Sequence, residues 1–394
     1  FTIVPMLVRM ERPSRTPAPI PLGLPPRPIP ATPPEARKGR GATVNPSGRF
    51  ERYSREAFAD DWSNPGWSDG GGTDYVPPPI RTEVGVDATK TIIAYNTSPD
   101  IGFDRSINPY RGCEHGCVYC FARPTHSYFG LSAGLDFETK LFAKPEAAKL
   151  LEAELAAPKY VCQPIAMGTN TDPYQPVERS FKVTRSILEA LERCDHPVTI
   201  VTKSALVARD ADILARMAKK NLVWVGVSVT TLDKELARRM EPRAATPARR
   251  LAAIRALAEA GVPVGVMVAP VVPAVTDHEL EAIMEAARDA GASAAGFIML
   301  RLPHEIKDLW MEWLDVHAPM KKKRVLELIR GMRNGKLNDG NFGSRFRPTG
   351  GYAGMIRQRF MIAARRLGLE REGRPLDCTQ FKKPVLPGQQ LTLF

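Results

Sequence analysis

Short apolar runs alternate with helical stretches from about residue 100 to about residue 303. This alternation is typical of parallel βα units. The expected strands are Ile107–Tyr110, Ile165–Gly168, Val198–Val201, Val223–Val229, Val264–Val268 and Ala295–Leu300. Because six parallel strands with a crossover helix after each one curve toward a barrel, the sequence predicts an α/β fold, a partial (β/α)6 TIM-like barrel.

The sequence predicts several helix ends in the second half of this region. Thr246 precedes Pro247, a pair that favours a helix start, and Gly261 favours the end of the same helix. Thr276 and Glu279 have the spacing of a capping box, so we expect them to cap the next helix.

The segments that flank the barrel differ from it in composition. Proline and glycine dominate the N-terminal segment, which cannot bury enough apolar area to order itself. After the barrel, two further helices are expected at Pro319–Arg333 and Gly351–Leu367. We therefore divide the chain into a Pro/Gly-rich, largely disordered N-terminal extension (1–80), the barrel (81–303), a basic helical C-terminal extension (304–380) and a flexible tail (381–394).

Charge and cysteine content narrow the class of protein. The net charge of +12 favours polyanionic partners such as nucleic acid. No run of about 18 apolar residues is present that could cross a bilayer, and the first residues lack the features of a signal peptide. We expect a cytoplasmic protein without a membrane partner. Six cysteines in such a chain indicate metal or redox chemistry rather than disulfides.

Polar residues follow the expected strands, where the chemistry of such barrels gathers. They are Thr169, Asn170 and Asp172 after the second strand, Lys203 after the third, Ser228 and Thr230 in the fourth, and Arg301 after the sixth.

Three cysteines lie on a glycine-containing loop after the first expected strand. Cys113, Cys117 and Cys120 have the spacing C-x3-C-x2-C. Thiolates are the usual protein ligands of iron-sulfur clusters, and a [4Fe-4S] cluster needs four ligands, so three thiols leave one iron open. Two alternatives remain: a zinc site completed by His115 or His126, and an electron-transfer cluster closed by Cys162, Cys194 or Cys378.

This cysteine pattern, with the aromatic Tyr119 directly before the third cysteine, resembles the signature of radical S-adenosylmethionine enzymes. The resemblance implies a [4Fe-4S] cluster on the three cysteines whose open iron is chelated by S-adenosylmethionine. It also implies reductive cleavage of that cofactor to a 5′-deoxyadenosyl radical, and an electron donor such as flavodoxin or ferredoxin.

Residues 100 to 305 are similar to the branch of this family related to spore photoproduct lyase and labelled DNA repair photolyase-like. On position, Lys203 and Ser228 match contacts to bound S-adenosylmethionine, and an ammonium and a hydroxyl suit its carboxylate. Arg243 could reach the same carboxylate. The triplet Thr169, Asn170 and Asp172 matches the place where the wider family binds the amino group or ribose. The alternatives are a solvated strand end for Lys203, a buried strand serine for Ser228 and a surface ion pair for Arg243. For the residues after the second strand, the alternative is a simple turn.

One departure from that branch concerns the second strand. Spore photoproduct lyases place a cysteine near its end to return a hydrogen atom, whereas residues 166–172 contain none. Tyr128 and Tyr174 are the remaining hydrogen-donor candidates. The likeness therefore leaves three functions open: a radical enzyme acting on DNA or another nucleic acid, a radical enzyme acting on a small molecule or protein, and a non-enzymatic metal-site adaptor.

The last residues, Gln390 to Phe394, read Gln-Leu-Thr-Leu-Phe and resemble the pentapeptide that docks on the bacterial sliding clamp. Two apolar anchors behind a glutamine suit a hydrophobic groove on a partner, although such a tail could also pack on its own domain. Basic and aromatic residues suited to nucleic-acid contact are Lys321, Lys322, Lys323, Arg324, Arg345, Arg347, Arg357 and Arg359, with Phe342 and Phe346. A solvated helix face explains the lysine run equally well.

Overall fold

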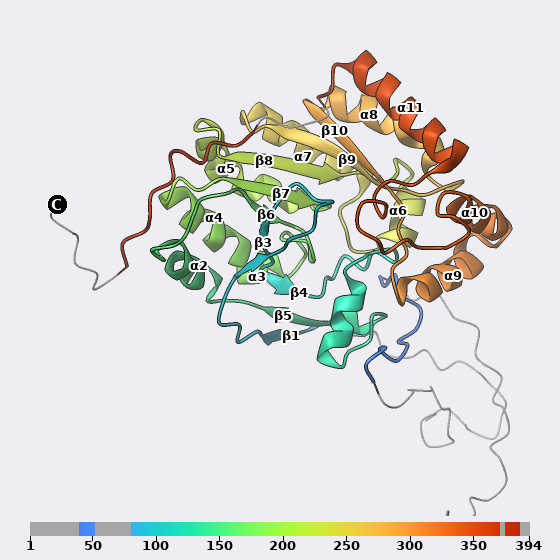
Figure 1. The fold of residues 1–394 in the computed structure, drawn as a ribbon, viewed down its shortest axis with the longest axis horizontal. Helices are drawn as coiled ribbons and strands as arrows, with labels where there is room; N and C mark the ends of the chain where they lie inside the picture. Colours follow the sequence, from blue (N-terminus) through green and yellow to red (C-terminus); the bar gives the residue numbers. More distant parts are fainter. Residues whose placement is uncertain (1–38, 52–79, 371–374, 387–394) are drawn as a thin grey trace, which may run out of the picture. The chain divides into compact units, whose positions relative to one another are not determined.

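Two β-sheets organise the chain, which a computed structural model describes for residues 39–51, 80–370 and 375–386. All these residues belong to one unit. The larger sheet has the strand order β10-β9-β8-β7-β6-β3-β2, and the smaller has the order β1-β5-β4 (Figure 1). The strands are β1 (Glu83–Val86), β2 (Ile93–Tyr95), β3 (Arg105–Ile107), β4 (Tyr110–Arg111), β5 (Lys140–Ala143), β6 (Ile165–Met167), β7 (Val198–Thr202), β8 (Val223–Ser228), β9 (Val264–Val271) and β10 (Ala294–Met299).

The larger sheet is the parallel sheet that the sequence predicts. Strands β3 and β6 to β10 run parallel, and only β2 is antiparallel, at one edge. The buried faces of β7 and β8 carry Val, Ile and Thr, as in a sheet covered on both sides. The prediction of an α/β, partial TIM-like barrel is therefore confirmed.

The first expected strand, Ile107–Tyr110, is wrong as a single element. It divides into β3, in the large sheet, and β4, which pairs with β5 in the small one. Pro109 lies between the two strands and has no N–H group to give to a ladder, so the chain leaves the first sheet there. This break sends the following cysteine loop across the carboxyl ends of the parallel strands.

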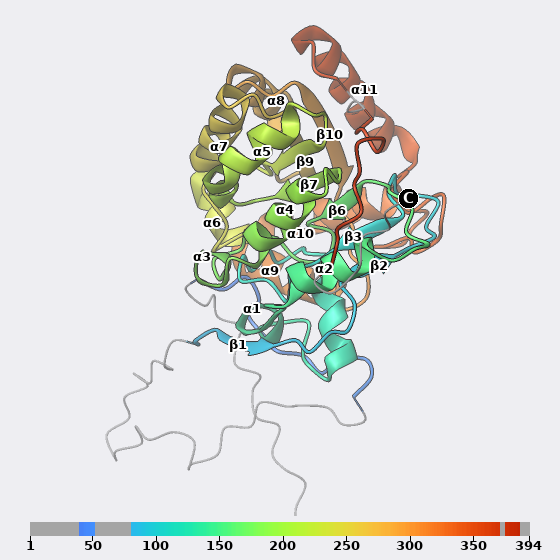
Figure 2. The ribbon, with the colours of Figure 1, turned by 90° about the vertical axis from the view of Figure 1, so that its left-hand side faces the viewer.

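Helices follow the strands and pack beside the sheet, where Figure 2 shows α4, α5, α7 and α8 along one side. The helices of the barrel are α1 (Asp136–Thr139), α2 (Ala147–Leu155), α3 (Glu178–Phe181), α4 (Val183–Arg193), α5 (Ala211–Ala218), α6 (Lys234–Met240), α7 (Pro247–Glu259) and α8 (Leu280–Asp289). Helix α7 begins after Thr246 with Pro247 at its first turn, as predicted, although the Thr246 side chain makes no cap hydrogen bond.

The expected capping box is wrong. Thr276 precedes a short 3-10 helix, η3 (Asp277–Glu279), and its side chain makes no cap hydrogen bond there. The Thr276 hydroxyl accepts a hydrogen bond from Val272 N at 2.9 Å instead. Glu279 accepts hydrogen bonds from the Thr231 hydroxyl and from Leu232 N, in the loop after β8. Both side chains therefore form hydrogen bonds with loop residues instead of capping a helix.

Three helices form the C-terminal extension: α9 (Ile306–His317), α10 (Pro319–Gly331) and α11 (Gly350–Leu367). The last two match the predicted helices, whereas α9 was not predicted. It is held by Trp310 and Trp313, which stack with ring centroids 4.9 Å apart, and Trp313 donates to the Arg239 carbonyl on α6. Helix α11 lies beside α8 in Figure 1, joined to it by ion pairs such as Arg359 to Glu281.

Some expectations fall outside the described residues. Residues 1–38 and 52–79 of the N-terminal extension are not among the described residues, and neither is the clamp-like motif Gln390 to Phe394. The described part of the tail, residues 381–386, packs on the barrel, where Phe381 meets the rings of Tyr160 and His196. Within the described ranges, no helix is long and apolar enough to span a bilayer.

Candidate metal and cofactor site

The three cysteines lie on a loop that the protein holds by backbone hydrogen bonds. Cys113 N donates to the Phe137 carbonyl at 2.9 Å, and Val118 N donates to the Met240 carbonyl at 3.0 Å. Cys120 N donates within the loop to the Cys117 carbonyl. Cys113 and Cys117 are buried, and Cys120 is half-buried. The three sequence-predicted cysteines thus lie on one loop that backbone hydrogen bonds hold in place.

Two glycines allow the loop its path. Gly112 and Gly116 have φ angles of +73° and +67°, in the left-handed region. A Cβ atom on Gly112 would lie 2.6 Å from Leu141, and one on Gly116 would lie 2.8 Å from the Glu138 carboxylate. These positions therefore need glycine both for backbone conformation and for space.

The chemistry of the donor set fits an iron-sulfur cluster. Burial raises the pKa of all three thiols, and the nearby charges of Asp172 and Glu241 raise the pKa of Cys113 and Cys117 further. A thiol in such surroundings keeps its proton unless a cation takes its place. Iron ions supply that compensating positive charge.

The two histidines of the zinc alternative each contact a protein group through one ring nitrogen. His115 Nδ1 lies 3.3 Å from Asp172 Oδ2, and His126 Nε2 lies 2.9 Å from the Lys140 carbonyl. The buried Nδ1 of His126 has no hydrogen-bond partner among the described residues. Across the described ranges, no three His, Cys, Asp or Glu side chains, the three cysteines included, converge closely enough to hold a single metal ion.

Asp172 links the cysteine loop to the end of β7. Its carboxylate meets His115 and accepts hydrogen bonds from Lys203 N at 2.7 Å and from the Thr202 hydroxyl at 2.6 Å. Burial opposes ionisation, but the charge and hydrogen bond of His115 and the bonds from Lys203 and Thr202 lower the pKa of Asp172 to about 2. Asp172 is thus an ionised support of the loop.

A buried network fixes Tyr119, the aromatic residue before the third cysteine. Its hydroxyl donates to Glu241, which also accepts from the Thr230 hydroxyl at 2.7 Å and pairs with Arg250. Burial opposes ionisation, yet Arg250 and Lys203 together with these hydrogen bonds lower the pKa of Glu241 to about 2. The sequence analysis missed Glu241 and Arg250, although Glu241 lies only two positions before the candidate residue Arg243.

Lys203 lies between this network and the cysteines. Its Nζ is 5.7 Å from the centroid of the Tyr119 ring and donates to the Ala269 carbonyl at 3.1 Å. Against the larger effects of burial and of Glu241, its positive charge lowers the pKa of Cys117. The ammonium is half-exposed at the rim and retains donors for an anion.

The other predicted cofactor contacts occupy the same rim. Ser228 is buried at the end of β8, and its carbonyl accepts from Arg250 at 3.0 Å. Arg243 N donates to the His115 carbonyl, and the Arg243 guanidinium lies 3.1 Å from Glu114 Oε1. Arg243 thus lies against the cysteine loop.

Asn108 holds the loop after β6. Its side chain exchanges hydrogen bonds with the Thr169 hydroxyl and accepts one from Asn170 N at 2.9 Å. This fixes Thr169 and Asn170 beside the turn that leads into the cysteine loop. Of these two side chains, that of Asn170 is exposed to solvent and that of Thr169 is half-buried.

The two hydrogen-donor candidates lie in different surroundings. Tyr128 is 69% exposed and packs on Phe50, with Arg49 beside it. Tyr174 is completely buried, and its ring lies under the Arg209 guanidinium. A surface ring among N-terminal residues and a core ring are both poor hydrogen donors to a substrate at the rim.

Two further buried side chains clamp the cysteine loop. Gln175 donates to the Gly112 carbonyl at 3.1 Å and accepts from Glu114 N at 2.8 Å. Arg123 donates to the carbonyls of Cys117 and Gly116 and pairs with Glu138. Both side chains are completely buried. Sequence reasoning had no signal for Gln175, whereas Arg123 follows the third cysteine by only three positions.

The N-terminal segment 39–51 packs directly against this loop. Gly41 N and Ala42 N both donate to the Glu138 carboxylate, at 3.0 and 2.8 Å. A Cβ atom on Gly41 would lie 1.8 Å from the Gly116 carbonyl oxygen. The segment therefore supports the cysteine loop at a point where only glycine fits.

Replacing Gly41 with alanine should lower the free energy of unfolding by about 1–3 kcal/mol, the usual cost of inserting a methyl group into a packed site. Urea unfolding of the full chain measures this. Gly340→Ala is the matched control, because a Cβ atom there meets nothing within 4 Å. Equal stability of the two variants would show that segment 39–51 does not press on the cysteine loop in solution.

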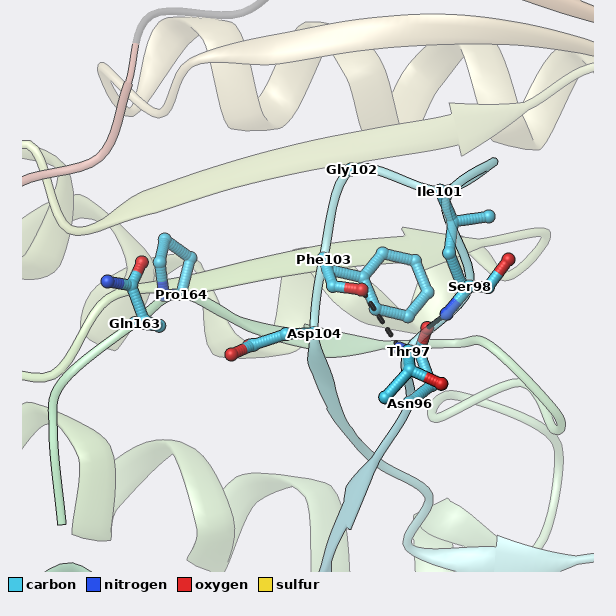
Figure 3. Close-up of a pocket in the computed structure, with 9 residues that line it drawn as sticks. All are labelled: Asn96, Thr97, Ser98, Ile101, Gly102, Phe103, Asp104, Gln163 and Pro164. Carbon is cyan, nitrogen blue, oxygen red and sulfur yellow. Dashed lines mark hydrogen bonds between the residues drawn. The ribbon is translucent and has the colours of Figure 1, made fainter. Parts of the chain in front are cut away.

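A surface hollow of about 470 Å³ lies at the other end of the strands (Figure 3). It is lined by the loop between β2 and β3 and by Gln163 and Pro164 before β6, and Asn96 donates to the Phe103 carbonyl across it at 2.9 Å. Because it meets the amino ends of β3 and β6, this hollow is separate from the cysteine loop.

Comparison with known proteins adds relatives and a family. Residues 107–287 match the family described as the radical SAM superfamily. An uncharacterized protein of Mycobacterium tuberculosis is 39% identical over 230 residues, which are 58% of this chain and 68% of that protein. An uncharacterized protein of Acidianus two-tailed virus is 30% identical over 219 residues, covering 53% of this chain and 70% of that protein.

Solved structures share the fold at low identity. Spore photoproduct lyase complexed with dinucleoside spore photoproduct has a TM-score of 0.52 and 17% identity, covering 73% of this chain and 80% of that one. A mutant of the same lyase with bound AdoMet and dinucleoside spore photoproduct has the same TM-score, 0.52, at 16% identity and the same coverage, 73% and 80%.

Proposed function

Because this chain belongs to the radical SAM superfamily, we propose that it is an enzyme that holds a [4Fe-4S] cluster on Cys113, Cys117 and Cys120 and cleaves S-adenosylmethionine reductively. The observation that carries this proposal is the set of three thiols on one pinned loop, with the Lys203 ammonium facing them. Three cysteines leave one iron for a ligand from outside the protein. When bound, the cluster supplies the electron that breaks a carbon–sulfur bond of the cofactor.

The protein's own groups would hold and orient the cofactor. Lys203 offers an ammonium and Ser228 a hydroxyl to its carboxylate, on neighbouring strands. Arg243 is a further cation at the same loop, shared with Glu114. Asn170, the exposed member of the loop after β6, is available to the amino group or ribose. Asp172 we now assign to support of the loop, since its oxygens are occupied by protein groups.

Burial around the cysteines protects reactive chemistry from water. Tyr119, Glu241 and Arg250 form a buried network beside Cys117 in which each of these groups has a protein partner. Exclusion of water limits quenching of reactive intermediates. Tyr119 belongs to the cysteine loop after β4, Glu241 follows α6, and Arg250 lies on α7.

For the substrate we propose a nucleic acid. The net charge of +12 and the basic C-terminal extension support a polyanionic partner. The neighbours in fold include a lyase solved with a dinucleoside photoproduct. The lyase-type hydrogen return is not part of this proposal, because residues 166–172 hold no cysteine and Cys162 precedes β6, at the opposite rim. Recruitment through Gln390 to Phe394 stays a prediction.

The proposal is tested by anaerobic reconstitution with iron and sulfide, followed by incubation with S-adenosylmethionine and dithionite. We expect a brown protein with about four irons per chain that releases 5′-deoxyadenosine. A colourless protein that retains zinc and releases none would overturn it in favour of a structural metal site. Repeating the assay with irradiated DNA, intact DNA and no nucleic acid then tests the substrate class.

A further inference from the structure

A ladder of stacked arginine and phenylalanine side chains stands at the carboxyl end of β10. The Arg301 guanidinium lies 4.3 Å from the centroid of the Phe346 ring. The Arg345 guanidinium lies 5.1 Å from the same ring and 4.7 Å from the Phe342 ring. The order is therefore Arg301, Phe346, Arg345, Phe342, and the last ring is 65% exposed.

The arginines in and beside the ladder carry more positive charge than the neighbouring carboxylates balance. Arg333 approaches it from α10 and donates to the carbonyls of Leu300 and Arg345. Asp100 accepts from Gly343 N at 2.6 Å and from Arg345 Nε at 2.7 Å, so it is already engaged. Burial, followed by the charges of Arg345 and Arg333, lowers the pKa of Arg301 to about 10, which leaves it a cation at neutral pH.

Arg301 is the member of the ladder with donors to spare. In the part of the chain that the structure describes, its buried Nε has no hydrogen-bond partner. The same holds, over the same described residues, for the buried Nε of Arg333. A buried donor without an acceptor costs roughly 1–3 kcal/mol, so a site that keeps one is suited to an external acceptor. Guanidinium groups match the oxygen geometry of a phosphate.

We propose that this ladder, Arg301, Phe346, Arg345 and Phe342, binds a nucleic-acid strand, with a phosphate on Arg301 and an unpaired base of the strand stacked on Phe342. An exposed ring at the end of a cationic stack takes a base that is not stacked on its neighbours, which excludes an intact duplex. Arg301 directly follows β10, and Arg345 is bonded to Asp100 on the loop between β2 and β3, so the ladder lies between the end of β10 and that loop. The inference rests on the proposed nucleic-acid substrate.

The test is binding of a fluorescein-labelled single-stranded DNA to the full chain, followed by anisotropy at several salt concentrations. Phe342→Ala should weaken binding by about 5- to 150-fold and leave the salt dependence unchanged, because a stacking contact carries no charge. Arg301→Gln should lower the slope of log affinity against log salt by about 0.7, the value for one phosphate contact on a single strand.

Two control variants test whether the loss of binding is specific to the ladder. Lys159→Gln removes an exposed charge from the loop after α2, and Phe181→Ala removes an exposed ring from α3. Both should bind as the unmodified chain does. An abasic strand should bind the unmodified chain and Phe342→Ala equally, and a duplex of the same sequence should bind more weakly than the single strand.

Three results would overturn the inference: no binding by the unmodified chain, no effect of either ladder variant, or equal losses in the control variants. Thermal unfolding of each variant checks that it is folded. Release of 5′-deoxyadenosine without nucleic acid is measured on the same preparations. If the release persists while strand binding fails, the ladder proposal is wrong and the radical chemistry stands; if release fails, the proposed function is wrong.

Discussion

Replacing Cys117 with alanine should abolish both iron binding and the release of 5′-deoxyadenosine. Three thiols hold the proposed cluster, so the loss of one leaves two irons without a protein ligand. The buried position of Cys117 offers no second thiol or imidazole to replace it, because His115 is paired with Asp172. We expect the broad visible absorption to disappear and S-adenosylmethionine cleavage to fall at least about 10³-fold, a conservative bound for a residue without which the reaction has no electron source.

Iron content, the visible spectrum and deoxyadenosine release are the three measurements. Cys378→Ser is the control, since Cys378 lies in the segment 375–386, near the amino ends of the strands. It should retain iron and cleavage. Should Cys117→Ala keep about four irons while Cys378→Ser loses them, the cluster would be held elsewhere and the assignment of the cysteine loop would be wrong.

Removing the carboxylate of Glu241 should lower the free energy of unfolding by about 3–5 kcal/mol, the usual effect of leaving a buried cation without its partner. Glu241 and Arg250 are almost completely buried, and the same carboxylate receives the hydroxyls of Tyr119 and Thr230. Glu241→Ala would remove the acceptor that Tyr119, Thr230 and Arg250 share. Urea unfolding measures the change.

A second variant separates charge from packing. In Glu241→Leu with Arg250→Met, both charges are absent, so most of the lost stability should return. The matched control is Glu235→Ala on the same helix, whose pairing with Arg239 at 3.6 Å is exposed and should contribute less than about 1 kcal/mol. If Glu241→Ala proved no less stable than Glu235→Ala, the network would not support the rim.

The fold could be predicted because its strands are apolar runs with clear ends. Strands β6 to β10 were predicted with ends at most three residues from those observed, since a parallel strand buried on both faces depends on local composition. The first strand could not be predicted correctly because Pro109 divides it between two sheets. Helix α9 escaped prediction because it is held by contacts such as the hydrogen bond from Trp313 to Arg239 on α6, a partner distant in sequence.

The candidate site was predictable only where its residues carry a spacing. The cysteines and Tyr119 lie within eight positions, and Lys203 and Ser228 follow from strand ends. By contrast, Glu138 reaches Gly41 across 97 positions, and Tyr119 reaches Glu241 across 122. Contacts of this kind join residues that are far apart in the sequence, so no local sequence pattern predicts them.

The two edge strands of the large sheet, β2 and β10, do not pair with each other. Among the contacts between the segments attached to them are those of Asp100 and Ser98 with Gly343 and Arg345. The Asp100 side chain in these contacts is buried, and Gly343 donates through its backbone N–H. The side of the barrel between β2 and β10 is therefore closed by contacts of loops and not by paired strands.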